Sequence, residues 1–136
     1  MRAMSCEFCE RTFRGDVMFD DDTAMIILHE DWAVRGHAMV VSKSHVENVS
    51  ALDPGRWERF AEIYREAEKI LLQLTGADRA IILKLGIMTP HLHLHIYPVS
   101  AALDRADVMK IIDGKMRKPR NEQFVDEVRA TMSGLP

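Results

Sequence analysis

The segment His91-Leu92-His93-Leu94-His95-Ile96-Tyr97 places three histidines at alternate positions with aliphatic residues between them. Successive side chains of a β-strand point to opposite faces, so a strand here puts the three histidines on one face and the aliphatic residues on the other. Exposed strand faces ordinarily carry Thr, Lys or Glu rather than a row of imidazoles. The pattern therefore predicts a strand with a functional histidine face.

One metal ion cannot take all three of these histidines. Positions i and i+4 of a regular strand lie about 13 Å apart, whereas zinc needs each ligating nitrogen near about 2.1 Å. At most two neighbouring histidines can share an ion. At least one is then left for nucleophilic or acid–base chemistry.

Cys6 and Cys9 are the only cysteines, and they form a Cys-x-x-Cys pair. Such a pair can be a redox couple, half of a zinc site or two unrelated thiols. A redox pair is expected between a strand and a helix, whereas this pair lies in a polar N-terminal arm. A zinc site needs two more ligands, for which His45 and the histidine strand that begins at His91 are the natural donors. Two thiolates and two imidazoles would close the tetrahedron, so that site would be structural and would hold the arm against the sheet.

The chain has 136 residues, which is the size of one domain. We expect a single domain over 1–136, with an irregular arm at 1–15, a core at 16–100 and a helical segment at 101–136. Short apolar runs predict strands, interrupted by turn residues such as Gly36. The expected strands cover 17–19, 23–29, 32–34, 38–42, 80–85 and 92–99.

A long helix is predicted after Asp53, a good N-cap, with Pro54 in its first turn and Gly76 at its end. Its apolar residues recur at steps of three and four and are assigned to the core: Trp57, Phe60, Ala61, Tyr64, Ala67, Leu71 and Leu74. Shorter helices are expected at 104–112 and from about 121. Together these elements predict an α+β fold, in which an antiparallel sheet carries one long packing helix and a C-terminal helix.

Charge and hydropathy exclude two classes of partner. The net charge is −3 and the isoelectric point about 6.1, so no basic surface is expected to hold a nucleic acid. No apolar run approaches the roughly 20 residues that cross a bilayer. The N-terminal residues do not resemble a signal peptide, and we therefore expect a cytoplasmic protein.

The segment 91–97 resembles the signature of the histidine triad (HIT) superfamily, in which histidines and apolar residues alternate. Gly36-His37 and the following strand, with Lys43 and His45 at its end, resemble the strand that precedes this signature in the family. Cys6-x-Phe-Cys9 is similar to the N-terminal zinc pair of its metal-bearing, bacterial-type members. The resemblance runs from Cys6 to about Val99, in the family's order.

The resemblance implies a homodimer of α+β subunits that acts on a small nucleotide as a hydrolase or transferase. By position, His93 would be the nucleophile that attacks the α-phosphorus, and a nucleotidyl-histidine would be released by water or another acceptor. His95 and His37 would assist catalysis and contact the phosphoryl group. Zinc would be held by Cys6, Cys9, His45 and His91.

Two positions differ from the usual family pattern. Many members have an acidic or amide residue that contacts ribose where this chain has His29, and glutamine near the phosphates where it has Ile87. Thr89 can supply one hydroxyl near the phosphates, and we expect Thr89, His29, His37 and His95 to bind substrate. Two alternatives therefore stay open beside the enzyme: a nucleotide-binding module with weak catalysis, and a metalloenzyme with an open zinc on two triad histidines.

Overall fold

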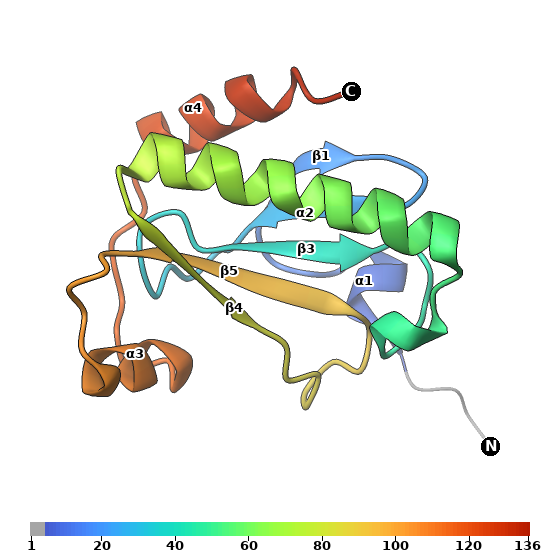
Figure 1. Cartoon of the computed structure of the whole chain (residues 1–136), viewed down its shortest axis with the longest axis horizontal. Coiled ribbons are helices and arrows are strands. Elements are labelled where there is room, and N and C mark those ends of the chain that lie inside the picture. Colours follow the sequence, from blue (N-terminus) through green and yellow to red (C-terminus); the bar gives the residue numbers. More distant parts are fainter. Residues whose placement is uncertain (1–4) are drawn as a thin grey trace.

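The computed structural model describes residues 5–136, and in that range it is an α+β fold, as predicted. Five antiparallel strands form one sheet in the order β1-β2-β3-β5-β4. In chain order the elements are α1 (Glu7–Glu10), β1 (Asp16–Asp20), β2 (Ala24–Leu28), β3 (Ala38–Ser42), a 3-10 turn (Val49–Ala51), α2 (Pro54–Thr75), β4 (Arg79–Leu83), β5 (His93–Val99), α3 (Arg105–Ile112) and α4 (Glu122–Met132). Figure 1 shows α2 crossing the sheet with α4 beside it, whereas α3 lies away from both, near the end of β5.

Helix α2 begins and ends at the residues that the sequence indicates. The Asp53 side chain accepts a hydrogen bond from the Arg56 amide, and Gly76 ends the helix with a φ of 73°. The helix buries one face against the sheet, through Phe60, Ile63, Ala67, Ile70 and Leu71. The prediction that Trp57 belongs to the core is wrong: its side chain is 39% exposed, because the first turn of α2 extends past the strands (Figure 1).

The two faces of the sheet are covered differently. The main core lies under α2 and α4, where α4 buries Phe124, Val125, Val128 and Met132. A smaller apolar cluster on β2 and β3 contains Phe8, which is only 4% exposed and comes from the N-terminal arm. The arm therefore folds back over the sheet, with the helical turn α1 where an irregular segment was predicted. Burial of Phe8 stabilises that turn.

The predicted strand at 32–34 is absent from the described residues, where Trp32 makes only an isolated bridge to Lys118. The His29 amide donates to the His37 carbonyl, and the His37 amide donates to the Val34 carbonyl. These bonds close residues 30–36 into a loop that Gly36 turns with a φ of 84°. The loop returns the chain so that His37 lies beside His29.

Candidate active site

The three triad histidines lie in three different environments. β5 starts at His93, so His91 precedes the regular strand and turns towards the N-terminal arm. His93 and His95 follow along β5, with ring centroids 5.2 Å apart. Met39 pairs with His95, and Val41 pairs with His93, in the register between β3 and β5. This division of the three rings agrees with the expectation that one metal ion cannot hold them all.

His91 belongs to a cluster with Cys6, Cys9 and His45. Its Nδ1 lies 3.3 Å from the Cys6 sulfur, 3.6 Å from the Cys9 sulfur and 3.0 Å from His45 Nδ1. The Cys9 sulfur lies 3.2 Å from His45 Nδ1. All four ligand atoms lie within 4.8 Å of one another. The arm and the strand region, 82 to 85 residues apart in sequence, thus meet at one point.

The cluster can bind a metal such as zinc. Bonds of about 2.0 Å to nitrogen and 2.3 Å to sulfur separate neighbouring tetrahedral ligands by about 3.3 to 3.8 Å, close to the spacing of these donors. The His91 Nε2–H donates to the Ser42 carbonyl oxygen at 2.6 Å. The proton on Nε2 leaves the Nδ1 lone pair for a metal, the usual arrangement for a ligating histidine. Burial lowers the pKa of His91, which further favours the neutral ring.

His93 is held in one defined tautomer. Its Nδ1 lies 2.6 Å from the His91 carbonyl oxygen, which can only accept, so Nδ1 carries the proton. In the neutral ring the lone pair is then on the other nitrogen, Nε2. The ring of Phe8 packs against His93 with centroids 5.0 Å apart. The site thus offers a positioned imidazole whose Nε2, in the neutral form of the ring, can act as a nucleophile.

His95 joins a second histidine group, with His37 and His29. The His37 Nε2 lies 3.0 Å from the His95 Nδ1. The His37 ring stacks on His29 at 4.3 Å and on Tyr97 at 4.2 Å. Burial, with neighbouring histidines adding to it, lowers the pKa of His37 to about 2 and that of His95 to about 3. Both rings are therefore neutral at physiological pH.

The geometry of this group does not suit a shared metal ion, although its three ring nitrogens lie within 4.8 Å of one another. The rings of His29 and His37 are stacked with only 6° between their planes. An imidazole lone pair lies in the plane of its ring, so two parallel stacked rings cannot both direct a lone pair at one ion. His29 Nδ1 also accepts the Asp31 amide at 3.0 Å.

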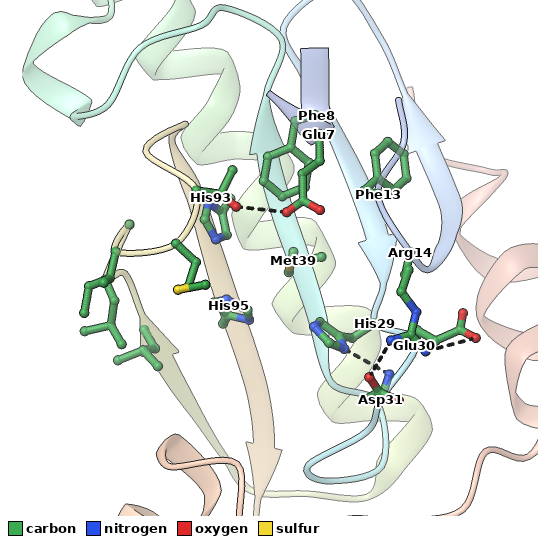
Figure 2. A pocket seen from close by; sticks show the side chains of 16 residues that line it. Glu7, Phe8, Phe13, Arg14, His29, Glu30, Asp31, Met39, His93 and His95 are labelled. Atoms are coloured by element: carbon green, nitrogen blue, oxygen red, sulfur yellow. Dashed lines mark hydrogen bonds and ion pairs between the residues drawn. The ribbon is translucent and has the colours of Figure 1, made fainter. Parts of the chain in front are cut away.

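A cavity of about 430 Å³ opens over His93 and His95 (Figure 2). The arm forms one wall with Phe8 and Phe13, and the loop after β4 forms another with Ile87 and Thr89. The Thr89 hydroxyl donates to the Glu7 carboxylate at 3.0 Å across the opening.

The rim of this cavity carries ion pairs. At its far end Arg14 pairs with Asp31 at 3.3 Å and with Glu30 at 3.8 Å. The Arg14 side chain is 70% exposed, so these pairs hold it at the mouth rather than within the cavity. The cavity therefore combines three histidines, His29, His93 and His95, with an apolar wall and a charged rim.

The structure brings most of the predicted site residues together. His29, Thr89, His93 and His95 line the cavity, whereas His37 is 4% exposed and lies behind His95. Sequence reasoning missed the cavity residues that come from the arm and from the loop after β2: Glu7, Phe8, Phe13, Arg14 and Asp31. The one available signal was the apolar Phe8, because a residue between the two cysteines must lie close to any metal that they hold.

The HIT domain family model matches residues 10–101. A histidine triad protein from Sinorhizobium meliloti 1021 has a TM-score of 0.74 and 18% identity, over 96% of this chain and 94% of that chain. A hypothetical histidine triad nucleotide-binding protein from Sulfolobus tokodaii strain 7 has a TM-score of 0.66 and 23% identity, over 93% of this chain and 87% of that chain. A HIT family hydrolase from Clostridium thermocellum has a TM-score of 0.57 and 18% identity, over 76% of this chain and 98% of that chain.

The chain belongs to the HIT domain family, as its triad indicated. Among the solved structures, the Clostridium thermocellum protein is described as a hydrolase and the Sulfolobus tokodaii protein as nucleotide-binding. Across the described residues, 5–136, none of the helices has the length and apolar character needed to cross a membrane.

Proposed function

We propose that this protein is a nucleotidyl hydrolase or transferase that acts on the α-phosphate of a nucleoside phosphoester, phosphoanhydride or phosphoramidate. The observation that carries this proposal is the tautomer of His93, whose proton on Nδ1 is held by the His91 carbonyl. In the first step Nε2 bonds to phosphorus and the leaving atom departs with its electron pair. In the second step water or another acceptor attacks phosphorus and releases a proton to the solvent, the N–P bond breaks, and its electron pair returns to Nε2. Covalent catalysis of this kind divides one difficult displacement into two easier ones.

His37 acts in this proposal by fixing the proton of His95. Two arrangements fit the 3.0 Å contact, because either ring nitrogen can donate. The His37 Nδ1 is buried without a hydrogen-bond partner among the described residues. An unpaired lone pair there is more acceptable than an unpaired N–H, since orphaned buried N–H groups are the rarer case. His37 then donates from Nε2, and His95 presents Nε2–H at the cavity.

His95 thereby stabilises the leaving atom as charge develops on it. A neutral ring donates a hydrogen bond without itself becoming an anion, and a fixed donor in a partly buried site stabilises a developing charge more than water does. A small nucleotide also needs neutralisation at its phosphate. His95 supplies a donor there, and the Thr89 hydroxyl, which donates to Glu7 in this structure, can turn to the phosphate. The net charge of −3 does not favour the many phosphates of a nucleic acid.

The nucleoside is placed by this proposal along the arm wall. Phe8 and Phe13 have ring centroids 5.9 Å apart and offer aromatic surface to a base. His29, at the far side of the cavity, would contact the ribose. Its Nδ1 already accepts the Asp31 amide, so the ring offers a single remaining nitrogen, Nε2, in place of a carboxylate that could accept from two hydroxyls.

We also propose that the Cys6, Cys9, His45 and His91 cluster holds a structural zinc. Four protein ligands would close the coordination sphere, which disfavours the open-zinc metalloenzyme. The bound ion supplies stability, by fixing α1 and Phe8 beside His93. His91 thus serves twice: its ring belongs to the metal cluster, and its carbonyl sets the tautomer of His93.

A homodimer is proposed through the outer edge of β4. β4 ends the sheet, and its free edge pairs with no other strand of residues 5–136. On β4 and the loop after it, four large apolar side chains are exposed, namely Ile82, Leu85, Ile87 and Met88, by 52%, 56%, 78% and 92%. Unprotected apolar edges favour pairing with another chain, and a second copy supplies a self-complementary strand.

The deciding experiment is to trap the covalent intermediate. Purified protein is incubated with dinucleoside polyphosphates and nucleoside phosphoramidates, quenched in base to preserve the N–P bond, and digested for mass spectrometry. We expect one nucleoside monophosphoryl group on His93, and none on the His93→Ala protein. Tight nucleotide binding without an adduct or turnover would support the alternative of a binding module, which the apolar Ile87 and the imidazole of His29 favour.

A further inference from the structure

A second cavity adjoins the first on the far side of His95. Its volume is about 300 Å³. Five residues line both cavities, namely His29, Asp31, Leu83, Leu85 and His95. Since β5 runs from His93 through His95 to Tyr97, the second cavity continues along the strand in the direction away from the nucleophile.

The walls of this second cavity are largely apolar. Ala33, Tyr97 and Ile111 are at most 7% exposed and form one apolar cluster, against which Met116 packs. Arg117 lies at its rim, where its guanidinium pairs with Asp31 at 3.4 Å.

The outer wall comes from α3 and the residues after it, up to Arg117. This segment lies outside residues 10–101, the part that the family model matches. The outer wall of the second cavity is therefore supplied by residues beyond the part that the family model matches.

We propose that the second cavity receives the leaving group of the reaction, and that this group is apolar or aromatic. The inference rests on the proposed function. In an in-line displacement the leaving atom lies opposite the attacking nitrogen, across phosphorus. With His93 Nε2 attacking and His95 donating to the leaving atom, that atom lies on the His95 side of phosphorus.

The body of the leaving group then extends past His95 into the space beside Tyr97 and Ile111. The nucleoside occupies the first cavity, along Phe8 and Phe13. In the step itself the N–P bond to His93 forms and the P–O bond breaks. The leaving oxygen keeps the electron pair and accepts the hydrogen bond from His95.

The test uses leaving groups that differ in size and hardly in acidity. Adenosine 5′-phosphate is esterified with phenols that carry a para methyl, ethyl or butyl group, and kcat/KM is measured for each ester. Each methylene placed in the apolar cavity should raise kcat/KM about threefold. The butyl ester has three more methylenes than the methyl ester and should therefore exceed it by about 30-fold.

Two variants test whether the preference for the butyl ester arises in the second cavity. Met116→Gln keeps the length of the side chain and makes the wall polar, whereas Met116→Trp fills the cavity. Both should reduce the butyl-to-methyl ratio to about two or less. Met109→Gln is the matched control, because Met109 is 43% exposed on α3 and lines neither cavity. Its ratio should equal that of the wild type.

The outcomes separate the two proposals. Equal kcat/KM for all esters in the wild type, or a ratio unchanged by both Met116 variants, overturns the leaving-group cavity and leaves the proposed function standing. If no ester forms an adduct on His93 or reacts, both proposals fall. A ratio that falls in the Met116 variants alone supports the cavity.

Discussion

His95 Nδ1 and His37 Nε2 lie 3.0 Å apart, although the two residues are 58 positions apart in sequence. The register of β3 and β5 sets this contact, because Ala38, which follows His37, pairs with Ile96, which follows His95. Burial keeps both rings neutral, with pKa values lowered to about 2 for His37 and about 3 for His95. The pair is therefore a fixed hydrogen bond between neutral rings rather than a titrating pair at physiological pH.

The first prediction is that this pair makes the protein less stable in acid. Histidine in the unfolded chain titrates near about 6.5, whereas these two rings resist protonation in the folded protein. Below pH 6.5 the unfolded state binds more protons, so the free energy of unfolding falls as the pH falls. Each ring contributes up to about 1.4 kcal/mol per pH unit until its folded pKa is reached. Chemical denaturation at pH 7.5, 6.0 and 5.0 measures the slope of the free energy of unfolding against pH.

The His37→Asn protein provides the comparison for that slope. The remaining ionisable groups are the same in both proteins. The difference between the two slopes therefore reports His37 and the neighbours that share its burial: His29, His95 and Tyr97. Between pH 6.0 and 5.0, the slope of the free energy of unfolding against pH should be smaller in the variant by at least about 1 kcal/mol per pH unit. Parallel slopes for the two proteins would show that His37 is not buried as a neutral ring.

The second prediction concerns the metal. Wild-type protein purified without chelators should contain about one zinc per chain, and Cys9→Ser should contain almost none. Because metal binding and folding are coupled, the variant should melt about 5 °C lower or more. Elemental analysis and calorimetry measure both quantities. Lys43→Ser is the control, since Lys43 lies near His45 in sequence and pairs instead with Asp20. Wild-type protein that carries no metal and keeps its melting temperature in chelator would contradict the zinc site.

The third prediction concerns the edge of β4. Ile82→Lys places a charge among exposed apolar side chains at the end of the sheet, and should convert a dimer into a monomer. Sedimentation velocity over a concentration series measures the change in mass. Met109→Lys, which alters an exposed methionine on α3, should leave the dimer intact. A wild-type protein that is monomeric at all concentrations would exclude the β4 dimer.

Much of the fold follows from local sequence patterns. The cap at Asp53, the spacing of Phe60, Ala67 and Leu71, and the alternation after His91 specify their elements because caps and periodicity act within a few residues. The members of the metal cluster were also predicted, because a zinc site on two thiols needs two further donors and the family resemblance indicated His45 and His91. The four atoms indeed lie within 4.8 Å of one another.

Other features depend on contacts between distant segments. The stack of His37 on His29 requires the loop at 30–36 to close, and this loop was predicted to contain a strand. The Phe8 and Phe13 wall requires the arm to fold over β2 and β3, which no periodicity in the arm indicates. The second cavity requires α3 to pack near Tyr97. Tertiary packing decides each of these, and local propensity does not report it.

The last prediction divides the labour within the triad, because the three rings have different partners. His93→Ala removes the proposed nucleophile and leaves the four metal donors in place. Folding, metal content and nucleotide affinity should be close to wild type, while kcat falls at least about 10³-fold. His91→Ala should instead lose metal and melt at a lower temperature, since it removes the ring bonded to the Ser42 carbonyl. Its activity should fall in proportion to the loss of folded, metal-bound protein.

His95→Ala should lie between these two. It removes a hydrogen-bond donor to the leaving atom, so kcat should fall about 10²- to 10⁴-fold without loss of metal. The loss should be smaller for substrates with more acidic leaving groups, which need less stabilisation as they depart. His93→Ala should show no such dependence, because the nucleophile is absent for every substrate. All rates are compared at equal folded fraction, measured by circular dichroism. Near-normal turnover by His93→Ala would exclude the covalent mechanism, and an equal loss for all leaving groups in His95→Ala would exclude the donor role of His95.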